Sequence, residues 1–208
     1  MNLHFLMVLW LIVYFLIIAY LDMKFQLLRD TSTADKKPYS LSRVQLAWWM
    51  GFVLCAFVAL VFDKNNPDFS IPTFSDGILI ILGISTGTTA AASLTDVSDE
   101  TNDQVTRHQN SNGTNLILDI LSDKGGASVH RLQAVFFNLI FAVWFFLKVW
   151  NEKIIPDLEP NALILLGLSS GTYAALKTQE NKDTSGSNPD FKAEKADDKN
   201  ENDIPPVG

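Results

Sequence analysis

Five apolar blocks that carry almost no charged side chains constrain this chain more than any other feature. The first runs from Leu3 to Leu21. At about 1.5 Å per residue, a helix of this length measures about 28 Å, close to the hydrocarbon thickness of a bilayer. The blocks stay apolar on every helical face, which is typical of helices in lipid. The other four blocks are Leu46–Phe62, Gly77–Leu94, Leu132–Trp150 and Ala162–Leu176. The sequence therefore predicts an all-α membrane protein with five transmembrane helices.

The composition agrees with a membrane location. The chain is 48% hydrophobic and 19% charged, whereas soluble domains carry about 25% charged residues. Its net charge is −7, and the excess acid lies in the segments 95–131 and 178–208. An acidic balance argues against nucleic acid as a partner. We therefore expect the lipid bilayer to be the main surroundings of the chain.

The distribution of Lys and Arg predicts how the chain is oriented. Alternate sides of the five blocks carry 13 and 3 of these residues. Cytoplasmic loops carry the excess of positive charge in membrane proteins. This asymmetry places the N-terminus outside the cell membrane, and the long loops and the C-terminus in the cytoplasm.

The chain also contains an internal repeat. The segment Ser40–Gln45 matches Ser128–Gln133, and Leu82–Thr88 matches Leu166–Thr172. The copies are offset by 88 residues at the start and by 84 at the end, because the outer loop of the second copy is shorter. Each copy starts and ends on the same side. The pattern predicts one leading helix followed by two parallel copies of a helical hairpin, related by a pseudo-two-fold axis along the membrane normal.

These signals divide the chain into five parts. The cytoplasmic loop includes a short interfacial helix over Asn115–Asp123, with Thr114 as its N-cap and Gly125 as its C-cap. The acidic tail has few large apolar residues and is expected to be disordered. The parts are the first transmembrane helix over 1–22, a first hairpin over 23–94, the loop over 95–131, a second hairpin over 132–177, and the tail over 178–208. The last helix, Ala162–Leu176, is short for a membrane span and is expected to insert as the second half of its hairpin.

Small residues recur every four positions on the return helix of each hairpin. This spacing places them on one helix face, where two backbones can approach closely in lipid. The candidate helix-packing residues are Gly83, Gly87 and Ala91 in the first copy and Gly167, Gly171 and Ala175 in the second. We favour packing within the chain over contact between subunits. The third alternative is that neighbouring hydroxyl side chains line a polar path.

An Arg and a Gln recur where each hairpin starts. The candidate interfacial residues are Arg43 and Gln45 in the first copy and Arg131 and Gln133 in the second. At headgroup level the arginines would anchor the helices, hold lipid phosphate, or pair with Asp30 and Asp123. Ser42 and Gln45 also fit the pattern of a capping box. An anchoring role is favoured over a ligand site.

No pattern in the sequence predicts catalysis, a metal or a cofactor. The histidines His4, His108 and His130 are scattered without a second ligand at helical spacing, and the single cysteine, Cys55, lies in an apolar run. No charged side chain falls at the middle of an expected helix, which argues against an ion-coupled transporter. We therefore expect a protein that is not an enzyme.

The repeated Arg/Gln starts and the Leu-Gly-[Ile/Leu]-Ser-x-Gly-Thr returns resemble a unit found in uncharacterised bacterial multipass membrane proteins. The resemblance implies a bacterial inner membrane, with the N-terminus in the periplasm, and implies no activity. We expect a non-enzymatic protein that self-associates into a homo-oligomer and perturbs the membrane, as an effector of a toxin or antiphage defence system does. The alternative is a membrane sensor or scaffold whose loop and tail recruit a soluble cytoplasmic protein.

Overall fold

The computed structural model describes residues 2–66, 68–101, 112–123 and 126–179. Most of these residues are helical. The long helices are α1 (Leu3–Phe25), α2 (Leu41–Val61), α3 (Asp76–Glu100), α5 (Val129–Glu152) and α6 (Pro160–Gln179). A short helix, α4 (Leu116–Leu121), precedes two antiparallel strands of two residues each, β1 (Ser122–Asp123) and β2 (Gly126–Ala127).

Four of the described helices, α1, α2, α3 and α5, are long and apolar enough to cross a membrane. Large apolar side chains such as Leu16, Met23 and Phe136 are exposed on the outside of the helices, where lipid would cover them. The expectation of a largely helical membrane protein is therefore confirmed. The described α6 is not among the four candidate spans. Five crossings remain a prediction.

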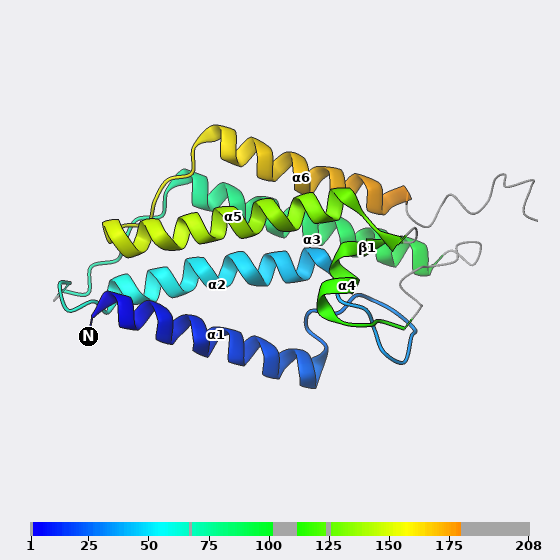
Figure 1. Cartoon of the computed structure of the whole chain (residues 1–208), viewed down its shortest axis with the longest axis horizontal. Coiled ribbons are helices and arrows are strands. Elements are labelled where there is room, and N and C mark those ends of the chain that lie inside the picture. Colours follow the sequence, from blue (N-terminus) through cyan, green and yellow to red (C-terminus); the bar gives the residue numbers. More distant parts are fainter. Residues whose placement is uncertain (1, 67, 102–111, 124–125, 180–208) are drawn as a thin grey trace, which may run out of the picture.

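The long helices lie side by side along the molecule (Figure 1). Helix α1 packs on α2, which also packs on α3 and α5, and α6 packs on α3 and α5. At the N-terminal end of the bundle, His4 Nε2 lies 3.0 Å from the Trp150 carbonyl oxygen. At the same end, the Ser75 hydroxyl donates to the Pro156 carbonyl oxygen over 3.1 Å. The opposite end carries α4, the two strands and the connection from α1 to α2.

Two hydrophobic clusters hold the bundle together. The larger is built from all five long helices and includes Leu3, Trp49 and Phe145. Within it the Trp49 indole Nε1 donates to Asn138 Oδ1 over 2.6 Å, so this buried N–H group has an acceptor. The smaller cluster lies at the opposite end, where Tyr173 of α6 packs with residues of α2, α3 and α4.

The helices extend past the apolar blocks that predicted them. Helices α2 and α5 begin directly after Ser40 and Ser128, the first residues of the two repeated segments. Helix α3 continues to Glu100, well beyond Leu94. Backbone hydrogen bonding continues through the polar turns that flank each block, so the edge of a block is not the end of a helix.

The predicted caps are wrong in two places. Ser40 occupies the N-cap of α2, its side chain caps no backbone N–H, and Ser42 already lies inside the helix, so there is no capping box. The interfacial helix is shorter than expected, and its N-cap is Asn115, whose Oδ1 accepts from Leu118 N over 3.0 Å. The predicted C-cap Gly125 lies outside the described residues, as does nearly all of the acidic tail.

Candidate functional site

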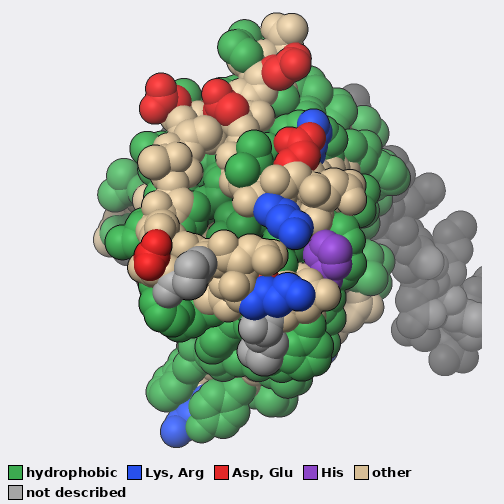
Figure 2. All heavy atoms as spheres, turned by 90° about the vertical axis from the view of Figure 1, so that its left-hand side faces the viewer, with side chains coloured by type: hydrophobic (Ala, Val, Ile, Leu, Met, Phe, Trp, Pro, Cys, Tyr) green, Lys and Arg blue, Asp and Glu red, His purple; other side chains and the backbone are tan. Residues whose placement is uncertain are grey.

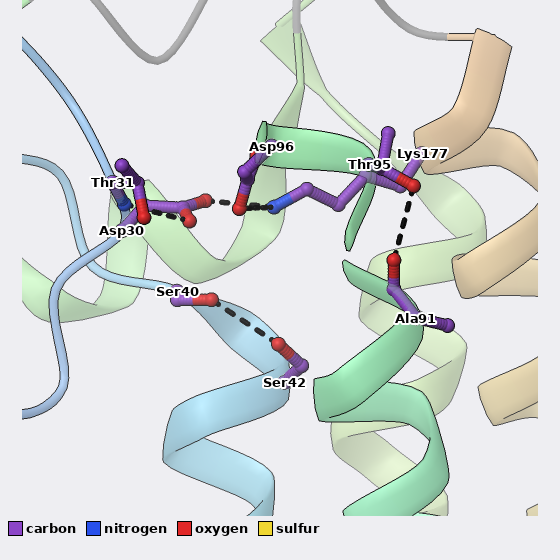
Figure 3. A network of polar contacts seen from close by, with 8 residues as sticks. All are labelled: Asp30, Thr31, Ser40, Ser42, Ala91, Thr95, Asp96 and Lys177. Carbon is purple, nitrogen blue, oxygen red and sulfur yellow. Dashed lines mark hydrogen bonds and ion pairs between the residues drawn. The ribbon is translucent and has the colours of Figure 1, made fainter. Parts of the chain in front are cut away.

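Three charged side chains meet inside the bundle, at the end opposite the N-terminus of α1 (Figure 3). The Lys177 ammonium group lies 2.8 Å from Asp30 Oδ2 and 3.1 Å from Asp96 Oδ2. Lys177, Asp30 and Asp96 are only 3%, 7% and 2% exposed. We refer to these three residues as the ion cluster. It joins α6, the connection after α1, and α3, which are far apart in the sequence.

The local backbone brings each member of the ion cluster into place. Helix α1 ends at Phe25, and its C-cap residue Gln26 has a left-handed conformation. The chain then turns back on itself, with Asp30 N donating to the Pro38 carbonyl oxygen over 2.8 Å. Asp96 follows Ala92 by one turn on the buried face of α3. Lys177 follows the buried Tyr173 by one turn of α6. Helical spacing therefore points both charges into the same interface.

The ion cluster holds two acids against one base. Burial alone would raise the pKa of Asp30, but the nearby Lys177 charge and hydrogen bonds to the carboxylate outweigh it and lower that pKa below its usual value of 3.8. A buried ion pair gives little net stability compared with apolar packing. Removing one partner nevertheless leaves the other charge buried without a counter-charge, which destabilises the fold. This arrangement suits fastening three segments of the chain together.

Further polar contacts connect the helices around the ion cluster. Gln45 Nε2 donates to the Ser170 hydroxyl over 3.0 Å, and the Thr89 hydroxyl donates to the Ser42 carbonyl oxygen over 3.1 Å. The buried Arg131 guanidinium lies 5.4 Å from the centre of the Tyr173 ring, within the range of a cation–π contact. This end of the bundle is therefore held by polar side chains as well as by apolar packing.

The predicted interfacial residues do not occupy equivalent places in the two copies. Gln45 is buried between α2 and α6, whereas Gln133 is exposed. Arg131 is buried over an aromatic ring, whereas Arg43 is half-buried. Asp30, a candidate partner for these arginines, instead pairs with Lys177. That expected pairing is wrong, because α6 reaches the loop between α1 and α2 with its own cation.

Sequence reasoning missed the ion cluster because Lys177 and Asp96 fall just outside the apolar blocks and were counted as loop charges. A signal was present in the helical spacing. Thr88, Ala92 and Asp96 lie on one face of α3, and Tyr173 and Lys177 lie on one face of α6. An acid and a base on the return helices of the two copies could have suggested a pair between them.

The glycines predicted to pack lie mainly on outward faces. Gly83, Gly87 and Gly171 are exposed, and a side chain added at any of them would meet nothing within 4 Å. An added side chain at Gly167 would meet only Ile84, at 3.5 Å. The remaining predicted residues are Ala91, which is half-buried, and Ala175, which is exposed. Packing against another helix of the same chain therefore does not describe Gly83, Gly87 or Gly171, and contact between subunits remains a prediction.

Hydroxyl side chains occupy the buried faces instead. Ser85 and Thr88 of α3 and Ser169 and Ser170 of α6 are all buried. Ser85 lies two positions from Gly87, and two positions rotate about 200° around a helix. The helices α3 and α6 thus bury hydroxyls and leave Gly83, Gly87 and Gly171 open. We refer to the two surfaces, at Gly83 and Gly87 on α3 and at Gly171 on α6, as the glycine faces.

No group of three His, Cys, Asp or Glu residues suited to a metal occurs within the part of the chain that the structure describes. The His4 ring stacks on Trp150 with centroids 4.1 Å apart, and Cys55 is buried. His130 lies beside Ser128, and His108 is outside the described residues.

Comparison with family models, with curated proteins and with solved structures finds no match for this chain. The geometry of the ion cluster and of the glycine faces is therefore the basis for a functional proposal.

Proposed function

We propose that this chain is a non-enzymatic multipass membrane protein that self-associates through its glycine faces and perturbs the membrane when assembled. The observation that carries the proposal is the open space at Gly83, Gly87 and Gly171. These small residues contribute little to packing within the chain, although they recur at equivalent positions of the repeat.

The physical reason is the nature of helix association in lipid. Apolar side chains gain little by leaving lipid for another helix, so close backbone approach and van der Waals contact drive association. A face with glycine every four residues lets a second helix approach closely. Exposed hydroxyls beside the glycines, such as Thr86 and Thr172, add donors for contacts between helices.

We also infer that α6 crosses the membrane as a fifth span. It packs against α3 and α5, both of which are candidate spans, and the Lys177 charge that lowers its hydropathy is neutralised by the ion cluster. Five crossings agree with the Lys and Arg asymmetry, which places the N-terminus in the periplasm and the ion cluster near the cytoplasm. The setting in a bacterial inner membrane, and a role as an effector of a toxin or antiphage defence system, belong to the same proposal.

Inducible expression with a membrane-potential dye tests the proposal. We expect the wild-type chain to depolarise the cells, and the double variant Gly87→Leu with Gly171→Leu to leave the potential intact at equal expression. Ala19→Leu is the matched control, because Ala19 is exposed on α1, away from both glycine faces. Depolarisation by the double variant as strong as that by the wild type would contradict the proposal. Self-association without depolarisation would favour a scaffold that recruits a soluble partner.

A further inference from the structure

A hollow of about 390 Å³ lies between α1, α2, α4 and α5. In Figure 1, α1 and α2 draw apart towards the end that carries α4. The Tyr14 hydroxyl of α1 still reaches the Ala47 carbonyl oxygen of α2, and the hollow begins there, beside Ala47, Phe15 and Ile18. A space of this size suits a bound molecule, since ligand pockets range from about 300 to 1,000 Å³.

The walls of the hollow are largely apolar side chains. They include Ile18 of α1, Val44 and Trp48 of α2, Ile120 of α4 and Val135 of α5. An apolar cavity holds water poorly and takes up apolar molecules instead. The walls therefore select an apolar occupant.

Two amide side chains also line the hollow, and both bond to other parts of the bundle. Asn138 Oδ1 accepts from the Trp49 indole over 2.6 Å, and its Nδ2 donates to the Ala134 carbonyl oxygen over 2.7 Å. Gln45 Nε2 donates to the Ser170 hydroxyl. These contacts fix the amides within the protein, so the hollow does not depend on a ligand to satisfy them.

The hollow opens on the side of the bundle that suits lipid. Leu116 of α4 and Leu139 of α5 line it and are 39% and 45% exposed. Beside this rim, Phe136 and Ile140 of α5 are also exposed. Figure 2 looks along the bundle from its N-terminal end, where charged side chains gather, and shows hydrophobic side chains around them. Because α1, α2 and α5 are each long and apolar enough to cross a membrane, the opening faces hydrocarbon when they do.

We propose that one acyl chain of a bilayer lipid, from the leaflet beside α4, occupies this hollow. The chain supplies the van der Waals contacts that side chains lining an empty space would lack. It enters sideways between α4 and α5 without leaving the membrane. The inference goes beyond self-association, because the hollow lies on α1, α2, α4 and α5, whereas the glycine faces lie on α3 and α6.

Other occupants fit the hollow less well. A charged headgroup would lose its hydration against apolar walls. A helix of a second copy would need small residues at the rim to approach closely, and the exposed rim residues are large ones such as Leu116, Phe136 and Leu139. An acyl chain meets neither obstacle, because it is apolar and narrow.

Photolabelling of the full chain in nanodiscs tests the proposal. The nanodiscs contain phosphatidylcholine with a photoactivatable diazirine in the middle of one acyl chain, and peptide mass spectrometry locates the label after illumination. We expect Trp48 and Val135 to be labelled at least about threefold more than Phe57 and Phe137, because the label marks groups in contact with the chain. Phe57 and Phe137 are the matched controls, since all four residues are half-buried and only Trp48 and Val135 line the hollow.

A variant that fills the hollow provides the second arm. Val135→Phe should lower the labelling of Trp48 at least about threefold, because the larger ring takes up the space of the chain. Val143→Phe is the matched control, since Val143 is exposed on α5 and does not line the hollow. Labelling of Trp48 no greater than that of Phe57, as expected if the hollow is empty or holds a second copy, overturns the proposal, and so does Trp48 labelling unchanged by Val135→Phe. Should Val135→Phe lose its helical circular dichroism, Leu139→Phe at the exposed rim decides the outcome by the same criterion.

Discussion

Polar side chains buried between apolar helices set much of the detail of this molecule at the residue scale. Lys177 reaches two carboxylates, Trp49 finds an amide oxygen on Asn138, and Gln45 reaches a hydroxyl on α6. Each contact joins segments distant in sequence. The polar groups in these contacts lose their hydrogen bonds to water on folding, so burying each group is favourable only while its partner is present.

Replacing Lys177 by Met should destabilise the fold strongly. The change leaves Asp30 and Asp96 buried without their cation, and breaking a buried pair costs about 3–5 kcal/mol. Lys148→Met is the matched control, because Lys148 pairs with Glu152 on the exposed side of α5 and such pairs contribute at most about 1 kcal/mol. Unfolding by SDS titration measures both variants. Equal stability of the two would show that the ion cluster does not fasten the helices.

Stability should fall in acid because of Asp30. Its pKa is lowered in the folded chain, so its contribution is fully present above the usual value of 3.8 and is lost as the pH falls through the lower folded value. Asp30→Asn should flatten this part of the stability profile, whereas Asp35→Asn, at an exposed position of the same connection, should not. Thermal unfolding measured over a pH series checks the prediction. A profile unchanged by Asp30→Asn would contradict it.

At the scale of the elements, the sequence predicted where the long helices lie more reliably than which faces they bury. An apolar block indicates a helix suited to lipid, because such a helix needs apolar side chains over the thickness of the hydrocarbon core. The faces of α3 and α6 are different, since Ser85 and Gly87 are both small and both suit helix packing. Only the neighbouring helices decide between such faces, and the structure buries the hydroxyls.

One close glycine contact lies at a position that the sequence patterns did not single out. An added side chain at Gly51 of α2 would come within 2.5 Å of the Tyr14 ring of α1. The Tyr14 hydroxyl also donates to the Ala47 carbonyl oxygen over 2.8 Å. Ala47 and Gly51 are spaced as small residues that let α1 approach α2. The internal repeat gave no indication of this contact between α2 and α1, because α1 belongs to neither copy of the repeat.

Gly51→Leu should therefore weaken the packing of α1 on α2. Forcing extra atoms into a packed interface costs about 1–3 kcal/mol, whereas the same change at the open Gly83 should cost little in the fold of a single chain. Unfolding of each variant in detergent, followed by Trp fluorescence, measures the difference. A greater loss at Gly83 than at Gly51 would contradict the packing described.

For the whole molecule, charge and periodicity predicted a membrane protein with long helices but not how its two ends differ. The ion cluster and its surrounding hydrogen bonds fasten one end, while His4 with Trp150 and Ser75 with Pro156 make the contacts at the other end. Both depend on contacts between residues such as Asp30 and Lys177, whose proximity follows from helix packing. The repeat predicted equivalent positions, yet Gln45 is buried against α6, whereas Gln133 is exposed.

Self-association through the glycine faces is the central claim, and counting subunits in lipid tests it most directly. Fluorescently labelled chain is reconstituted into vesicles at low density, and photobleaching steps are counted for each spot. We expect several steps for the wild type and for Ala19→Leu, and single steps for Gly87→Leu combined with Gly171→Leu. A wild-type chain that bleaches in single steps, or a double variant that keeps the wild-type step count, would contradict the claim.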